Sequence, residues 1–279
     1  MDAVDIVYRF YGRYRGEKRT IGSSACGMPI AALFVGEGEP RILLQYAIHA
    51  REWVTSLLAL DHIARGVPFG TAAFVPLANP DGAALALRGE RFLQTLPECR
   101  ADFLRRINGG PDFSLWKANA NAVDLNVNFD AEWGKGVCNV RAPAAENYIG
   151  AQPFSEPETR ALRDFTRAFR PAATVSFHTK GQEIYWEFGQ KGAARSRDKK
   201  MAETLAAAAG YRAKLVRGSC GGYKDWCIRA LGIPAFTIEA GSDALSHPLG
   251  EDRLPQLIAE CGGVPALVSE MVWKINSDS

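Results

Sequence analysis

The sequence has few histidines and no long apolar run, and the second shortage argues against a membrane protein. Only four of its 279 residues are histidine. No apolar run approaches the roughly 18 residues that predict a membrane span, and the amino terminus lacks the basic start and apolar core of a secretory signal. We therefore expect a cytoplasmic protein that has no membrane partner.

Blocks of like charge and clustered cysteines are also absent. The net charge is +2 at pH 7, which does not indicate a nucleic-acid partner. Six cysteines are scattered without a Cys-x-x-Cys spacing, which favours reduced thiols over a disulfide framework or a cysteine zinc site. Neither a Gly-x-Ser-x-Gly elbow nor a Gly-rich nucleotide-binding motif occurs, so serine hydrolases and nucleotide-binding proteins are disfavoured.

Short apolar runs alternate with helical patterns, which predicts an α/β fold. We expect residues 1–279 to form a single domain with a mixed, mostly parallel twisted sheet and helices on both faces. The predicted strands are Ile42–Ile48, Ala72–Ala78, Ala173–His178 and Ala235–Glu239. The predicted helices are Glu52–Arg65, ending at Gly66, then Ala193–Ala209 and Tyr223–Leu231. A last helical pattern over Arg253–Ile275 is interrupted by Gly262-Gly263 and Pro265.

Three local patterns qualify this outline. Asn79-Pro-Asp-Gly82 predicts a turn after a strand. Ser155-Glu-Pro-Glu158 predicts a capping box that opens a helix to about Phe169. Residues 97–153 are rich in Asn, Gly, Asp and Pro and predict long ordered loops, which are often functional in a compact domain.

Four polar residues share one position relative to the predicted strands. His49, Glu52, His178 and Glu239 lie at or just beyond strand carboxyl ends. Ligands of open α/β sheets bind at this edge. Histidine nitrogen and glutamate oxygen are ordinary zinc ligands, and a catalytic zinc takes three protein ligands. The pattern therefore predicts a zinc site, with Glu239 beside it as a base for a water whose pKa zinc lowers.

Each residue also has a structural interpretation. His49 could bond a backbone carbonyl, Glu52 could stabilise a helix amino terminus, and His178 could be a satisfied core histidine. Glu239 ends the apolar run Ala235-Phe-Thr-Ile-Glu239 and favours the metal-site interpretation over the structural one. A buried carboxylate is costly without a partner, and a metal-bound water would be such a partner. His62 and His247 lack such a setting, and we expect structural roles for both.

The chain resembles the zinc carboxypeptidase family over most of its length. The matching segments occur in the family's order: His49-Ala-Arg-Glu-Trp53, Asn79-Pro-Asp-Gly82, Val123-Asp-Leu-Asn126, Phe177-His178, Gly221-Gly222 with Asp225-Trp226, and Phe236-Thr-Ile-Glu239. The resemblance implies one zinc held by His49, Glu52 and His178, with Glu239 as general base. It also implies that Asp124 orients His49, although Asp124 could instead be a turn residue.

Two departures from the family pattern concern specificity. The family has Asn-Arg to clamp a substrate's terminal carboxylate, whereas this chain has Asn126-Val127. Valine cannot form the bidentate, charge-assisted bond of an arginine. A family tyrosine before Gly-Gly aligns with Arg217. Both changes weaken the expectation of exopeptidase action on ordinary C-termini.

Other segments resemble the bacterial γ-D-glutamyl-L-diamino acid peptidases, which cut peptidoglycan stem peptides. They are Trp116-Lys-Ala-Asn119, His178–Trp186 and Gly221-Gly-Tyr-Lys-Asp-Trp226. The resemblance implies that Lys117 stabilises the oxyanion. It further implies an anionic murein stem peptide as substrate partner, contacted by residues that singly could all be surface residues: Arg51, Asn126, Lys180, Arg217, Tyr223 and Lys224.

Our hypothesis from the sequence is a zinc metallopeptidase that hydrolyses the amide between γ-linked D-glutamate and a diamino acid. One alternative is a conventional carboxypeptidase or a small-molecule amidohydrolase of the same fold. A second alternative is a non-catalytic binding module on this scaffold, which the retained His49, Glu52, His178 and Glu239 disfavour.

Overall fold

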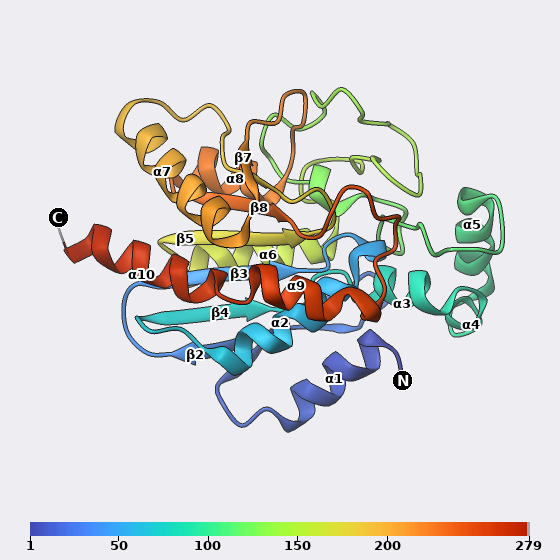
Figure 1. Cartoon of the computed structure of the whole chain (residues 1–279). Coiled ribbons are helices and arrows are strands. Elements are labelled where there is room, and N and C mark those ends of the chain that lie inside the picture. The colour runs from blue at the N-terminus through green and yellow to red at the C-terminus, as the bar shows by residue number, and fades with distance from the viewer. Residues whose placement is uncertain (278–279) are drawn as a thin grey trace.

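The computed structural model describes residues 1–277, and one eight-stranded sheet organises them (Figure 1). Its strand order is β1-β2-β4-β3-β5-β8-β6-β7. The strands are β1 (Lys18–Ser23), β2 (Pro29–Gly36), β3 (Arg41–Tyr46), β4 (Thr71–Val75), β5 (Ala173–His178), β6 (Glu183–Tyr185), β7 (Arg212–Lys214) and β8 (Ala235–Glu239). Neighbours within the central group β4-β3-β5-β8 are parallel, whereas β1-β2, β2-β4 and β6-β8 are antiparallel. The predicted mixed sheet is confirmed.

Helices cover both faces of this sheet (Figure 1). They are α1 (Ala3–Arg13), α2 (Val54–Arg65), α3 (Pro80–Arg88), α4 (Glu90–Leu93), α5 (Glu98–Asn108), α6 (Pro157–Phe169), α7 (Gly192–Ala209), α8 (Tyr223–Trp226), α9 (Leu254–Cys261) and α10 (Val264–Ser277). Short helical turns add η1 (Ala50–Glu52), η2 (Leu125–Val127), η3 (Cys227–Leu231, a π-helix) and η4 (Glu251–Arg253). Among residues 1–277, no helix combines the length and apolar character needed to cross a bilayer.

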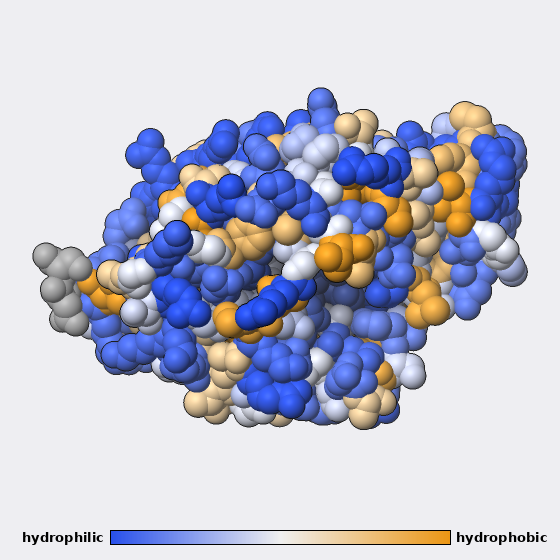
Figure 2. All heavy atoms as spheres, turned by 90° about the horizontal axis from the view of Figure 1, so that it is seen from above, coloured by the Kyte–Doolittle hydropathy of each residue, from blue (hydrophilic) through white to orange (hydrophobic). Residues whose placement is uncertain are grey.

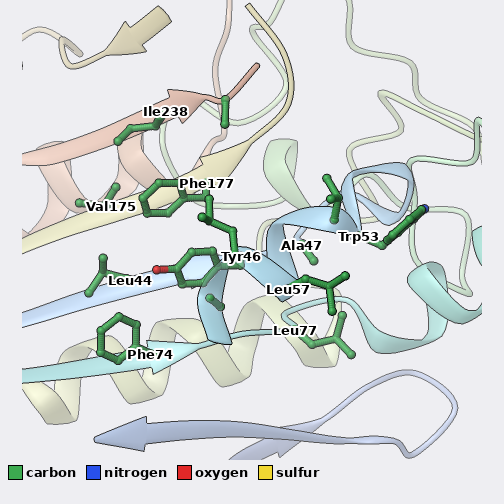
Figure 3. Close-up of a cluster of buried hydrophobic side chains, with 14 of the residues drawn as sticks. Leu44, Tyr46, Ala47, Trp53, Leu57, Phe74, Leu77, Val175, Phe177 and Ile238 are labelled. Carbon is green, nitrogen blue, oxygen red and sulfur yellow. The ribbon is translucent and has the colours of Figure 1, made fainter. Parts of the chain in front are cut away.

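Side-chain alternation along the strands divides the core into two layers. On β3, Ile42 and Leu44 pack with α1, α2, α7, α9 and α10, whereas Leu43 faces α6 and α8. Because the central strands are covered on both faces, β5 is buried at all six positions, including the polar residues Thr174 and Ser176. Figure 3 shows the first layer near the strand ends, where the rings of Tyr46 and Phe177 stack at 4.8 Å. This packing fixes the backbone immediately before His178.

Two sequence predictions fail at helix starts. The capping box at Ser155 is wrong: Glu156 is the N-cap and makes no side-chain cap, while the Ser155 hydroxyl donates to Glu156 Oε1 at 2.7 Å. Pro157 occupies the first helical turn instead. The turn predicted at Asn79-Pro-Asp-Gly82 is instead the start of the helix α3. Asn79 is its N-cap, and the Asn79 side chain accepts from Gly82 N.

Two further predictions are only partly right. Residues 97–153 are largely loop, but residues 98–108 form α5, which buries Ala101 and Leu104 and ends at Gly109 in the left-handed conformation. The pattern over Arg253–Ile275 is two helices, so the predicted interruption at Gly262-Gly263 is confirmed, whereas Pro265 lies inside α10 and interrupts nothing. The other predicted strands and helices are present with small shifts at their ends. The upper face of the molecule is mostly hydrophilic, with small separate apolar patches (Figure 2).

Candidate metal centre and active-site cleft

The side chains of His49, Glu52 and His178 converge at the carboxyl end of the sheet. His49 Nδ1 lies 2.9 Å from Glu52 Oε1, and His178 Nδ1 lies 2.9 Å from Glu52 Oε2. The two Nδ1 atoms are 3.1 Å apart. All three residues are at most 6% exposed, although His178 is 126 residues beyond Glu52 in sequence.

Strand register explains this convergence. β3 and β5 are parallel neighbours, with Tyr46 opposite Phe177, so both strands deliver their next residues to the same edge. After β3 the chain turns at Ala47, whose φ is 49°, a conformation uncommon for a residue with a Cβ. The Thr55 hydroxyl accepts from Ala47 N at 2.9 Å and supports this turn. The η1 turn then brings the Glu52 carboxylate to His49 Nδ1.

The arrangement fits a zinc ion. Two imidazole nitrogens facing each other at 3.1 Å cannot both act as donors, whereas both can bind one cation. Ligands of one tetrahedral zinc lie roughly 3.3 Å apart, close to the spacings here. Within residues 1–277, no other group of three histidine, cysteine or acidic side chains has this proximity.

Asp124 and Lys117 form a charged pair behind His49. Lys117 Nζ lies 2.8 Å from Asp124 Oδ2, and Asp124 Oδ1 lies 3.3 Å from His49 Nε2. Burial would raise the pKa of Asp124, but Lys117 and His49 hold that pKa well below its usual value. Burial would likewise lower the pKa of Lys117, yet Asp124 raises it. Asp124 is therefore a buried anion that can orient His49 and increase its basicity.

Glu239 lies beside this group at the end of β8. Its register partner on β5 is His178. Burial raises the pKa of Glu239 to about 7, with a further upward contribution from Glu52, against downward contributions from His178 and Lys117. A carboxyl group with a pKa near neutrality can both accept and donate a proton.

Of these residues, His49, Lys117 and Glu239 border a cleft of about 340 Å³. Its walls include His49, Lys117, Asn126, Val127, Tyr185, Arg217, Lys224, Thr237 and Glu239. The Lys224 ammonium pairs with Asp225 and donates to Glu187 O. Arg217 is exposed and, among the described residues, has no ion-pair partner. Arg217 therefore brings uncompensated positive charge to the cleft.

Some predicted substrate contacts are not in the cleft. Tyr223 is fully buried in the core layer under α6, where its hydroxyl lies 2.8 Å from Thr166 Oγ1, so its predicted place in the cleft is wrong. Lys180 does not border the cleft and donates to Asp243 O at 2.7 Å. Arg51 is also outside the cleft walls, with its guanidinium 3.3 Å from Glu146.

A structural role for His247 stays a prediction. Burial lowers its pKa, whereas the charge of Glu52 acts in the opposite direction. Its buried Nδ1 has no hydrogen-bond partner among the described residues. His62, by contrast, is a core residue between Tyr46 and Cys261 O.

Comparison with known proteins identifies the family. A family model described as zinc carboxypeptidase matches residues 71–249. The chain belongs to the zinc carboxypeptidase family. The matched region contains His178 and Glu239 but begins after His49 and Glu52, which the structure places beside them. Enzymes of this family depend on zinc, and the His-Glu-His group fits that ion.

Individual relatives point to two kinds of peptidase. The chain is 34% identical over 250 residues to Gamma-D-glutamyl-L-diamino acid endopeptidase 1 of Lysinibacillus sphaericus, covering 83% of this chain and 62% of that protein. It therefore spans less than two thirds of that relative's length. It is 28% identical over 192 residues to carboxypeptidase A2 of Rattus norvegicus, covering 62% and 42% of the two chains.

Solved structures share the fold at lower identity. Bovine thrombin-activatable fibrinolysis inhibitor superposes with a TM-score of 0.76 at 22% identity, covering 99% of this chain and 95% of that one. The murein-tripeptide amidase of Escherichia coli O157 gives a TM-score of 0.60 at 23% identity, covering 94% and 93%. These likenesses confirm the carboxypeptidase-like fold.

Proposed function

We propose that this chain is a zinc metallopeptidase that hydrolyses the amide between γ-linked D-glutamate and the diamino acid of peptidoglycan stem peptides. The observation that carries the proposal is the convergence of His49 Nδ1, the Glu52 carboxylate and His178 Nδ1 at 2.9–3.1 Å, at the edge of the cleft that His49 and Glu239 border. The name of the Lysinibacillus relative supports the choice of substrate.

The protein's own groups would divide the chemistry between them. His49, Glu52 and His178 would hold the ion, which when bound supplies a positive charge that polarises a carbonyl and lowers the pKa of a water. Glu239 would take a proton from the attacking water and pass it to the leaving amine. Lys117 would place its ammonium beside the developing oxyanion.

The charges of the cleft support an anionic substrate. A stem peptide carries free carboxylates on D-glutamate and on the diamino acid, and Lys117, Arg217 and Lys224 all border the cleft. Because Lys117 and Lys224 already have carboxylate partners, Arg217 has the most charge to offer. Val127 provides no cation where a carboxypeptidase would have one, which favours cleavage within the stem peptide over removal of an ordinary C-terminal residue.

A substrate panel tests this proposal. Purified protein is incubated with L-Ala-γ-D-Glu-diaminopimelate, with the α-linked isomer of that peptide, and with ordinary peptides that vary in their C-terminal residue. We expect release of the diamino acid from the γ-linked peptide alone and loss of that activity after chelation. Release of C-terminal residues from ordinary peptides, with the γ-linked peptide left intact, would refute the murein assignment.

A cytoplasmic location is part of the proposal. All six cysteines are free in the structure, which is typical of a reducing compartment. Such a location would suit hydrolysis of stem peptides that have entered the cell. Fractionation of the native host, with detection of the protein outside the cytoplasm, would contradict this element.

A further inference from the structure

The Asn79-Pro-Asp-Gly82 segment is buried next to the metal site, yet none of its side chains borders the cleft. We infer that Asn79 is a positioning residue that fixes Lys117 relative to the zinc ligand His49. The inference rests on the proposed function, and it concerns how the Lys117 ammonium is held at a fixed place relative to the metal site at His49. It gives the Asn-Pro-Asp-Gly motif a part in the reaction beyond starting α3.

The Asn79 side chain joins two segments that are far apart in sequence. Its Nδ2 donates to Ile48 O and to Ala118 O, both at 3.1 Å. Ile48 immediately precedes His49, and Ala118 immediately follows Lys117. One amide group therefore connects the backbone beside the zinc ligand to the backbone beside the catalytic cation.

Backbone hydrogen bonds strengthen this connection. Asn79 N donates to Ala47 O at 3.1 Å and so supports the turn at Ala47 that leads to His49. Ala50 N donates to Lys117 O at 3.0 Å, which ties the two segments directly. Asn79 is fully buried, so water cannot replace its hydrogen bonds at little cost.

Gly82 makes the close approach possible. Asn79 Oδ1 accepts from Gly82 N at 3.0 Å, which orients the amide so that Nδ2 faces the two carbonyls. A Cβ on Gly82 would lie 2.5 Å from both Ala118 O and Asn79 Nδ2, closer than van der Waals contact allows. Any side chain here would disturb the Asn79 bridge at one or both of these contacts, whereas glycine leaves the room that the bridge requires.

Coupling to Lys117 is what separates a positioning role from a structural one. If Asn79 acts through Lys117, its loss matters only while the Lys117 ammonium is present. We therefore propose a double-mutant cycle of Asn79→Ala with Lys117→Met. It is measured on kcat/KM for the γ-linked peptide and on the zinc dissociation constant, from chelator competition. The zinc measurement is relevant because Lys117 pairs with Asp124, which contacts His49.

We expect Asn79→Ala to lower kcat/KM about tenfold or more in the native background and within about twofold in the Lys117→Met background. We expect the same non-additivity in zinc affinity. Equal fold-losses in both backgrounds, for both readouts, would overturn the inference and leave Asn79 a structural residue. If no peptide is cleaved, the proposed substrate fails while the zinc cycle still decides the role of Asn79.

Asn128 provides a matched control. It is a buried asparagine whose Nδ2 donates to Ile149 O at 2.8 Å and Gln152 O at 3.0 Å, so it also joins loop backbones. Asn128→Ala should destabilise the protein but change both readouts by the same factor with and without Lys117. If Asn79→Ala does not fold, Gly82→Ala replaces it, because its Cβ would crowd both Ala118 O and the Asn79 amide and so break the bridge without removing a hydrogen-bonding group. Additive effects of Gly82→Ala and Lys117→Met would equally overturn the inference.

Discussion

Asp124 and Glu158 are both fully buried carboxylates, but their neighbours differ. Asp124 has the Lys117 ammonium at 2.8 Å and His49 at 3.3 Å, and its pKa is well below the usual value despite burial. Glu158 accepts from Ala25 N at 2.9 Å and from Asn119 Nδ2 at 3.1 Å, both neutral donors. Burial raises the pKa of Glu158 to about 7.

The difference shows that burial alone does not decide the charge of a carboxylate. Neutral donors offset part of the loss of solvation, whereas an adjacent cation offsets it fully. Near Asp124 the fold therefore keeps a permanent anion that can support a zinc ligand. The Glu158 carboxyl, which has a second buried acid, Asp81, nearby, instead carries an exchangeable proton. Glu239 shares the raised pKa of Glu158 but borders the cleft, where a proton can be used.

The largest effect should come from Glu239→Gln, which removes the exchangeable proton from the cleft. We expect kcat to fall about 10³-fold, the usual scale for a general base, with zinc content unchanged. Steady-state kinetics and metal analysis check this. Turnover within tenfold of the native protein would mean that another group moves the proton.

Lys117→Met should raise the pKa of Asp124, so that this buried carboxyl resembles that of Glu158. Without its cation the Asp124 carboxylate gains a proton more readily and supports His49 less well. We expect kcat to fall about 10²-fold and zinc affinity about tenfold. Chelator competition measures the second effect. Unchanged zinc affinity would show that Asp124 supports His49 without help from Lys117.

Glu158→Gln should change how stability depends on pH. The pKa of Glu158 is about 7 in the folded protein against 4.5 for the free side chain. Between these values the unfolded chain has lost its proton and the folded protein retains it. The free energy of unfolding of the native protein therefore falls by about 3 kcal/mol as pH rises through this window. The variant should lack that fall in thermal unfolding at pH 5 and 8, and identical slopes would contradict the assignment.

Arg217→Ala tests the unpaired cation of the cleft. We expect KM for the γ-linked peptide to rise about tenfold with kcat nearly unchanged, because the arginine binds substrate and transition state alike. The same peptide with amidated carboxylates should lose this dependence. An equal rise in KM for charged and amidated peptides would exclude Arg217 as a carboxylate contact.

Tyr223→Phe should have the smallest effect. The hydroxyl bonds Thr166 inside the core, so its removal should lower the free energy of unfolding by about 1 kcal/mol. Catalytic constants should remain native. A tenfold loss of kcat/KM without loss of stability would place the hydroxyl back in the reaction.

The metal site could be predicted from the sequence because strand periodicity carries the necessary information. His178 and Glu239 end apolar strands, and parallel strands bring their carboxyl ends to one edge, so neighbours in space follow from the pattern. The resemblance added Asp124 and Lys117, which lie in loops without periodicity. Their pairing depends on how residues 116–124 fold back, which no local pattern specifies.

Side-chain direction was the main source of error. Tyr223 and Lys224 are adjacent in α8, yet one enters the core and the other borders the cleft, because neighbouring helical positions face different sides. Ser155 has the spacing of a capping box, but Pro157 and the buried hydrogen bonds of Glu158 determine the start of α6. The sequence pattern does not distinguish α5 from the polar loops around it, because only two residues of this helix, Ala101 and Leu104, are buried.

Zinc content is the most direct test of the central claim, that His49, Glu52 and His178 hold one zinc used for amide hydrolysis. Native protein, Glu239→Gln and His178→Ala are purified without added metal and analysed by mass spectrometry for bound zinc. We predict about one zinc per chain in the first two and none in the third. Native protein that contains no metal and keeps full activity after chelation would contradict the account.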